Sequence, residues 1–448
     1  MVKKRTDEVW DIGRADSLMD AMFNEAKKLF GDDRFYTGSE SEQLVVGLPL
    51  PALCLRYLFQ STVFPLSRMT MITGQQGSCK SAFLYEIFRW HRLFGGRNIL
   101  LECETKDSPE LRASILGYDK KAVGVKPCHS LEEWQTALTR LITLNQELMT
   151  GTKANPGPGR IIPVCIGIDS LMAKASEENI EKVMKEGFAS RGHPVEALKI
   201  SQFMRVWPQK LFGWPFTVVG TNHLKPSTDA MGRPSRQIPG GMSLKFQETY
   251  EIEMAFIEDI KRADHDGITV QLMARKNSLG PSRKKIKASM VWWNDFVEPD
   301  SPEALELEES DFISPSSVGP TSIQRTMWNW HSATIDMLLE IQSKDPGRWK
   351  KIDPYLDLHA ERSKGNMIWS NALGISIVDK VTFREAGEIL ETKKDILTHL
   401  HALLGIRERY EFEPGKDFKN QIAEAKKVPS KAILDEESNT TEEETDNE

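Results

Sequence analysis

The sequence predicts an α/β protein with a mostly parallel central sheet, an antiparallel extension of that sheet, an N-terminal helix and a smaller helical C-terminal domain. Three observations predict this class. Strand and helix patterns alternate over residues 44–294. A Gly-rich stretch, 74–81, joins a buried strand pattern at 68–73 to a helix pattern. Three strand patterns, at 249–257, 268–275 and 285–293, then follow without a helix between them. Alternating elements favour parallel pairing, whereas successive strands favour antiparallel pairing.

Shifts in composition divide the 448 residues into five predicted segments. They are an N-terminal helix and oligomerisation arm at 1–43, a core at 44–294, an acidic linker at 295–321, a helical domain at 322–427 and a disordered acidic tail at 428–448. The core's further strand patterns are 97–102, 161–168 and 215–221. In the helical domain we expect four tryptophans to anchor a hydrophobic core rather than a ligand site: Trp328, Trp330, Trp349 and Trp369.

Charge and hydropathy limit the classes of partner. The net charge is −7, but residues 435–448 carry eight acidic side chains and no Lys or Arg, so the rest of the chain is slightly basic and nucleic acid is not excluded. No run approaches the roughly 18 apolar residues of a membrane span. The N-terminus lacks an apolar segment, and the five cysteines are scattered, without a Cys-x-x-Cys pair. We therefore expect no membrane partner, no signal peptide and a cytoplasmic protein with free thiols.

The Gly-rich stretch matches the pattern G-x-x-x-x-G-K-[ST] except that Cys79 replaces the second glycine. Backbone N–H groups of such a loop, with the N-terminus of the following helix, favour a bound phosphate. Lys80 would reach the β and γ oxygens, and the Ser81 hydroxyl would ligate Mg²⁺. The sequence therefore predicts that ATP and Mg²⁺ are bound by Gly74, Gln75, Gln76, Gly77, Ser78, Cys79, Lys80 and Ser81.

Cys79 supports two interpretations. A solvent-accessible thiol at a helix N-terminus and beside Lys80 is expected to have a lowered pKa and raised reactivity. Alternatively, Cys79 is an inert small residue turned toward the core.

Carboxylates follow two further predicted strands. Asp169 ends the strand pattern 161–168, and we expect it to hold Mg²⁺ beside the loop. Glu102 and Glu104 follow the pattern 97–102. Glu104 is the predicted group that polarises the attacking water, and Glu102 could equally be a structural acceptor.

The order of these motifs resembles the RecA recombinase family, in particular its phage UvsX-type members. The residues that carry the resemblance are 64–68, the loop, 217–223, Gly240-Gly241 and 274–277. The resemblance implies a RecA-like P-loop ATPase core. It implies a phosphate-sensing role for His223, which stands where the family has Gln. It also implies that Lys276 reaches the ATP of a neighbouring subunit. The family has a second lysine where this chain has Ser278, so either Arg275 takes the place of that lysine or no residue does.

The same resemblance implies two DNA-binding loops. One lies within 172–195, with Lys185, Arg191 and His193 as candidates, and the other runs from Lys225 to Pro239 and exits through Gly240-Gly241. Both lie in connections predicted to contain no strand. Basic side chains on a flexible backbone can bind the phosphates of DNA, and an apolar side chain can insert between its bases. The alternative interpretation is a basic loop that is only solvated and binds no DNA. The candidate DNA-binding residues are Arg191, Lys225, Met231, Arg233, Arg236, Ile238, Gly240 and Gly241.

The resemblance implies an ATP-dependent recombinase that forms head-to-tail filaments on single-stranded DNA and pairs it with homologous double-stranded DNA. A recombination mediator and a single-strand-binding protein are further expected partners, in a bacterial host cytoplasm if the protein is a phage protein. Two alternatives stay open. In the first, residues 276–281 resemble the corresponding region of hexameric DnaB-like replicative helicases. In the second, the differences from the family pattern at Cys79, His223 and Ser278 suit an ATP-binding DNA filament protein with little hydrolysis.

Overall fold

The computed structural model describes residues 28, 45–104, 106, 108–116, 123–155, 157, 159–186, 195–228, 234–237, 247–262, 265–297, 323–362 and 366–425. The chain forms two units, residues 1–45 with 422–448, and residues 46–421. In the first unit only Lys28, Val45 and residues 422–425 are described. The predicted N-terminal helix, except for Lys28, and the acidic tail therefore lie outside the described residues. The second unit, residues 46–421, contains the central sheet and the Gly-rich loop.

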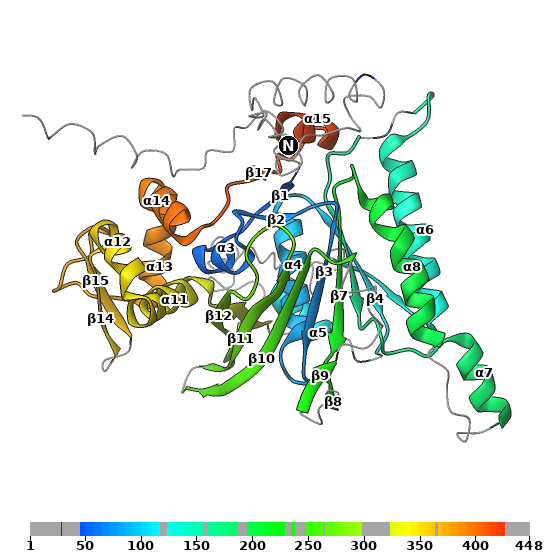
Figure 1. The fold of residues 1–448 in the computed structure, drawn as a ribbon, viewed down its shortest axis with the longest axis horizontal. Coiled ribbons are helices and arrows are strands. Elements are labelled where there is room, and N and C mark those ends of the chain that lie inside the picture. Colours follow the sequence, from blue (N-terminus) through cyan, green and yellow to red (C-terminus); the bar gives the residue numbers. More distant parts are fainter. Residues whose placement is uncertain are drawn as a thin grey trace, which may run out of the picture. The chain divides into compact units, whose positions relative to one another are not determined.

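A nine-stranded sheet forms the centre of this unit, in the order β13-β12-β11-β10-β3-β7-β6-β4-β5 (Figure 1). The strands from β10 through β3 to β5 pair in parallel, and β10 to β13 pair antiparallel. The predicted α/β class, with a mostly parallel sheet and an antiparallel extension, is confirmed. The strands are β3 (Arg68–Gly74), β4 (Arg97–Glu102), β5 (Val123–Pro127), β6 (Val164–Asp169), β7 (Phe216–His223), β10 (Tyr250–Lys261), β11 (His265–Asn277), β12 (Lys285–Val297) and β13 (Ile323–Trp328).

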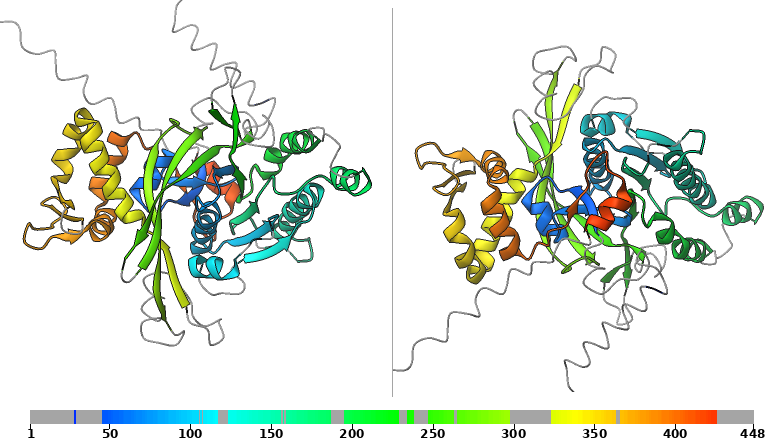
Figure 2. Two further views of the ribbon diagram at one scale, coloured as in Figure 1. Left: turned by 90° about the horizontal axis from the view of Figure 1, so that it is seen from below. Right: turned by 90° about the horizontal axis from the view of Figure 1, so that it is seen from above.

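Helices cover both faces of the parallel part (Figure 2). Helices α6 (Leu131–Thr150) and α8 (Val195–Leu211) share a buried apolar cluster with alternate residues of the strands, such as Ile166 and Ile168 of β6. Gly167, between these two residues, faces Leu84 and Phe88 of α4 (Lys80–Leu93) on the other side. This alternation follows from the two-residue period of a strand and explains why β6 is apolar throughout.

Strand β13 lies in the residues that follow the predicted linker, and it pairs with β12 in the central sheet. Beyond it come α11 (Trp330–Lys344), α12 (Pro346–Leu356), α13 (Phe383–Thr392) and α14 (Lys394–Leu404). A small sheet, β14 (Leu358–Glu361), β15 (Met367–Ser370) and β16 (Val381–Thr382), accompanies them. Trp330 Nε1 donates to Glu86 Oε1 on α4 at 3.0 Å. Trp328, Trp330 and Trp349 are buried as predicted, but Trp369 is only half-buried. Trp328 and Trp330 also contact the helix that follows the Gly-rich loop.

The remaining elements complete the unit. A second sheet has the order β17-β1-β2. The elements are β1 (Val46–Pro49), α3 (Leu53–Phe59), β2 (Val63–Pro65), α5 (Pro109–Leu116), α7 (Glu177–Glu186), β17 (Tyr410–Glu411) and α15 (Phe418–Ala425), whose last four residues belong to the first unit. None of the described helices is both long and apolar enough to cross a membrane.

The prediction that residues 223–240 contain no strand is wrong. Strands β8 (Lys225–Thr228) and β9 (Pro234–Gln237) form an antiparallel hairpin in which Lys225 pairs with Gln237. The Pro and Gly content suggested an irregular loop, but proline is compatible with the edges of a two-stranded ribbon, where its missing N–H needs no partner. The other connection, 172–195, contains α7.

Candidate functional site

The Gly-rich loop leaves β3 at Gly74 and enters α4 at Lys80. Ser78 Oγ folds back and donates to the carbonyl of Gln75 at 2.8 Å. A Cβ on Gly74 would lie 2.4 Å from Ser78 Oγ and 2.5 Å from the carbonyl oxygen of Met254. The turn of the loop therefore requires glycine at position 74, because no side chain fits between these atoms.

Cys79 occupies a backbone conformation that favours glycine, with φ of 61° and ψ of 27°. This conformation explains why the motif usually has glycine here, and an L-residue in it costs about 1 kcal/mol or more. Cys79 is also the N-cap of α4, yet its side chain makes no capping hydrogen bond, and the first turn contains no acidic residue. The positive end of the α4 dipole is thus not neutralised by the described loop, which favours an anion there.

The expectation of a lowered pKa for Cys79 is wrong. Burial raises the pKa of the thiol to about 11, although the neighbouring Lys80 ammonium acts in the opposite direction. Desolvation of the thiolate outweighs the adjacent charge and the helix dipole. Cys79 therefore fits the alternative interpretation, an inert residue. All five cysteines are described and all are free, as predicted.

Lys80 lies buried at the start of α4, and its Nζ donates to the carbonyl oxygen of Gln75 at 2.7 Å. Burial lowers the pKa of Lys80, and the carboxylates of Asp169 and Glu104 partly offset that shift. The ammonium is thus held by a backbone carbonyl of the loop, within the electrostatic influence of two acids from neighbouring strand ends.

Asp169 lies at the carboxyl end of β6, where two hydroxyl groups meet it. Ser81 Oγ donates to Asp169 Oδ2 at 2.5 Å, and Thr221 Oγ1 donates to Oδ1 at 2.5 Å. Burial raises the pKa of Asp169, and these two hydrogen bonds oppose the shift. The group consists of hard oxygen donors, which suit Mg²⁺. Within the described residues, no group of three His, Cys, Asp or Glu side chains could hold a metal ion by itself, so a Mg²⁺ here would complete its shell with phosphate and water oxygens.

Glu104 follows β4 and lies beside the same group. Ser170 Oγ donates to Glu104 Oε1 at 2.6 Å, and His223 Nε2 lies 2.8 Å from the same oxygen. Burial would raise the pKa of Glu104, but hydrogen bonds from Ser170 and His223 lower it, so the carboxylate form is favoured. Glu102 instead accepts the backbone N–H of Lys106 at 3.1 Å. Of the two glutamates, Glu104 contacts Ser170 and His223 beside Asp169, whereas Glu102 accepts a backbone N–H, as a structural acceptor would.

Two residues of this group, Thr221 and Ser170, were missed by sequence reasoning. Ser170 directly follows Asp169, and Thr221 precedes His223 by two residues on β7, the strand next to β6. Their side chains were recognisable only as hydroxyls close to predicted strand ends. Thr221 becomes a partner of Asp169 because β7 lies next to β6 in the sheet, and this strand order was not predicted from the sequence.

Lys276 does not lie with the loop. Lys276 pairs in register with Glu251, and Glu251 pairs with Met71, so the backbone of Lys276 lies level with the middle of β3 rather than with Gly74. Its Nζ donates to the carbonyl oxygen of Glu248 at 2.5 Å. Arg275, the expected substitute for a missing lysine, forms an ion pair with Glu253.

Most candidate DNA-binding residues lie outside the described part of the chain: Arg191, Met231, Arg233, Ile238, Gly240 and Gly241. For Lys225 and Arg236 the structure describes the backbone of the hairpin, in which Arg236 pairs with Pro226. The hairpin begins directly after Leu224, whose N–H donates to the carbonyl of Gly74 at 3.1 Å. The start of the hairpin is thereby attached to the first residue of the Gly-rich loop.

Comparison with models of known protein families and with curated protein sequences finds no match to this chain.

Proposed function

We propose that the chain binds ATP with Mg²⁺ at the Gly-rich loop and hydrolyses it. One observation carries this proposal: Ser81, the residue after Lys80, donates to Asp169 at 2.5 Å, so that a cation, a hydroxyl and a carboxylate converge beside an uncapped helix N-terminus. This is the set of groups that a magnesium-bound triphosphate needs.

Each residue has a role in this proposal. The loop amides and Lys80 hold the phosphates, and Ser81 and Asp169 hold the metal, which would supply charge neutralisation for the transferred phosphoryl group. Glu104 accepts a hydrogen bond from the attacking water and orients it. Its low pKa keeps it ionised and able to accept, with Ser170 and His223 fixing its position.

The wider proposal is a DNA-dependent ATPase that polymerises on single-stranded DNA and exchanges strands with homologous duplex. Its support is the RecA-like order of motifs, the α/β sheet with an antiparallel extension, and a hairpin that starts at the edge where the loop lies. Contact between the loop and the hairpin start would let nucleotide state alter how the hairpin meets DNA. Lys276, which lies level with the middle of β3 and donates to Glu248, is suited to meet the loop of a neighbouring copy in a head-to-tail assembly.

Electron microscopy of the protein on long single-stranded DNA with a non-hydrolysable ATP analogue tests this proposal. Continuous helical filaments that require the analogue are expected, and Lys80→Ala should abolish them together with nucleotide binding. Lys419→Ala, which removes an exposed lysine far from the loop in sequence, serves as the matched control and should form filaments normally.

Other outcomes would change the assignment. Closed six-membered rings would replace the recombinase with a hexameric helicase, and filaments without measurable ATP hydrolysis would leave a DNA-coating protein. Full nucleotide binding by Lys80→Ala would remove the loop from the proposal altogether.

A further inference from the structure

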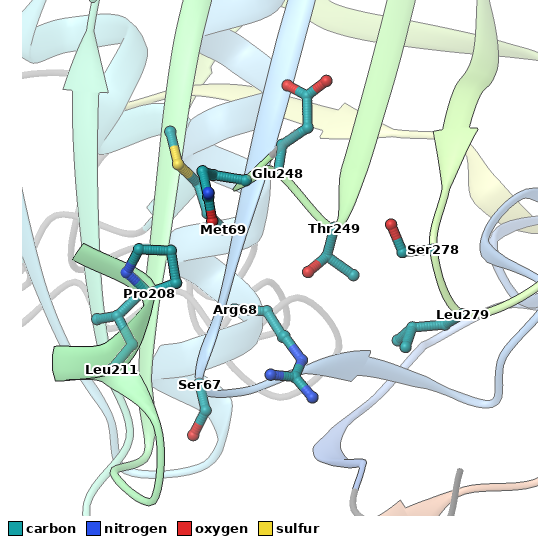
Figure 3. A pocket seen from close by; sticks show the side chains of 10 residues that line it. Ser67, Arg68, Met69, Pro208, Leu211, Glu248, Thr249, Ser278 and Leu279 are labelled. Carbon is teal, nitrogen blue, oxygen red and sulfur yellow. The ribbon is translucent and has the colours of Figure 1, made fainter. Parts of the chain in front are cut away.

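A cavity of about 310 Å³ opens at the amino end of β3, the end of the strand opposite the Gly-rich loop. Figure 3 shows the side chains that line it. They come from four separate parts of the chain: Ser67, Arg68 and Met69; Pro208 and Leu211; Gln247, Glu248 and Thr249; and Ser278 and Leu279. The lining combines hydroxyl and amide groups with apolar side chains, as small-ligand sites do.

Arg68 lacks a counter-charge in this cavity. Among the residues that the structure describes, its guanidinium forms no hydrogen bond and no ion pair. Its electrostatic neighbour is Tyr250, whose hydroxyl is kept neutral by burial and lies 3.3 Å from the carbonyl oxygen of Phe59. Burial lowers the pKa of Arg68, which is the expected response of a guanidinium that has lost water and gained no acid.

The groups around the cavity add positive charge. Lys276 Nζ donates to the carbonyl of Glu248, and Arg409 Nη2 donates to the carbonyl of Leu279 at 3.3 Å, so that both cations are attached to lining residues. Glu248 is the acid in the lining, and in Figure 3 its carboxylate and the guanidinium of Arg68 point to opposite sides of the view. Glu251 is a further acid near Lys276. Three cationic groups, Arg68, Lys276 and Arg409, therefore lie around the cavity together with two acids, Glu248 and Glu251.

We propose that this cavity is a binding site for a phosphate-type oxyanion, with Arg68 as its main ligand. A guanidinium presents paired N–H donors that match two oxygens of a phosphate, and a half-buried cation such as Arg68 binds an anion more strongly than a fully exposed one. The hydroxyls of Thr249 and Ser278 supply further donors from the cavity wall. Met69, Pro208 and Leu211 leave an apolar side for an organic group attached to the phosphate, and Leu279 lies across the cavity near Ser278 (Figure 3). This site is distinct from the Gly-rich loop and does not depend on the proposed function.

The experiment uses full-length protein carrying Lys80→Ala, which removes the cation of the loop and so weakens phosphate binding there. Thermal unfolding is measured in phosphate and in chloride at equal ionic strength, and phosphate affinity is measured by titration calorimetry. Phosphate is expected to raise the melting temperature. Adding Arg68→Met should remove this rise and weaken phosphate binding by at least tenfold, while the melting temperature in chloride stays the same or increases. Arg140→Met, which removes an exposed arginine of α6, is the matched control and should retain the rise.

Three results would overturn the site: no phosphate-dependent rise in the Lys80→Ala protein, a rise that survives Arg68→Met, or an equal loss of melting temperature in both salts, which would make Arg68 structural only. Inorganic phosphate and a nucleoside monophosphate are titrated separately to identify the source of the oxyanion. Tighter binding of the monophosphate would assign the apolar side to an organic group, and equal binding would restrict the site to phosphate itself.

Discussion

The two ends of β3 hold a cation in opposite ways. At the carboxyl end, Lys80 donates to a backbone carbonyl, and the carboxylates of Asp169 and Glu104 partly offset the effect of burial on its charge. At the amino end, Arg68 lines a cavity with no acid paired to it. Burying a charge is costly unless it is paired. The carboxyl end is therefore organised before any ligand binds, whereas the half-buried Arg68 at the amino end forms no ion pair with the residues that the structure describes.

The largest change is expected at the carboxyl end, for the variant Glu104→Gln. This substitution keeps the hydrogen bond with Ser170 possible but removes the charge that orients water, so ATP hydrolysis should fall about 10²–10⁴-fold. ATP affinity should change little, because Lys80, Ser81 and Asp169 remain. Hydrolysis is measured by phosphate release and affinity by calorimetry.

Glu102→Gln is the control for this variant, because it alters a structural acceptor only two residues away in the chain. It should hydrolyse ATP at nearly the normal rate. Equal losses in the two variants would contradict the assignment of Glu104.

The second prediction tests whether Asp169 is held charged for a metal. Burial raises the pKa of Asp169 above its ordinary 3.8, so ionised Asp169 costs stability as pH rises from that value through the folded-state pKa. Asp169→Asn should therefore raise the melting temperature at neutral pH without Mg²⁺ and flatten its pH dependence. It should also abolish the Mg²⁺ dependence of ATP affinity. A variant that melts lower and still responds to Mg²⁺ would remove Asp169 from the metal site.

The third prediction concerns the partners of Glu104. Hydrogen bonds from Ser170 and His223 lower its pKa, so its stabilising contribution is present above the ordinary 4.5 and is lost as pH falls through the folded-state value. His223→Ala removes one partner, so we expect that contribution to shrink by about 1 kcal/mol or less and to be lost at higher pH. Acid unfolding followed by circular dichroism measures the shift. An unchanged acid midpoint would show that His223 does not act on Glu104.

The smallest change is expected for the backbone at Cys79. Cys79→Gly removes the cost of a positive φ but adds chain entropy in the unfolded state, so the free energy of unfolding should rise by about 0.5–1 kcal/mol at most. Cys79→Ala keeps the strained φ and should show no such gain. Chemical denaturation measures both. A gain in the alanine variant alone would trace the effect to the buried thiol rather than to the backbone.

Several features were predictable because they depend on neighbours in sequence or on a general rule of sheets. Lys80 and Ser81 are adjacent and start a helix, so the loop sequence places both. The carboxyl ends of parallel strands meet at one edge, which is why Asp169 and Glu104 could be expected beside the loop before the strand order was known. The alternation of strand and helix patterns likewise predicted the α/β class.

Other features depend on which distant segments become neighbours. Thr221 contacts Asp169 because β7 lies next to β6, and β8 and β9 form a hairpin through pairing that Pro and Gly content conceals. Whether the Cys79 thiol is acidic depended on burial, which outweighed the charge of Lys80.

The amino-acid sequence was sufficient to predict the Gly-rich loop, the α/β class and the acids at the strand ends, because local backbone conformation and periodicity encode them. The folded chain was needed to identify the hydroxyl partners of Asp169, the position of Lys276 away from the loop, and the isolation of Arg68 in a cavity built from four segments. These features differ because the electrostatic state of a side chain depends on the groups and the solvent around it. Those surroundings are assembled from residues that are distant in the chain.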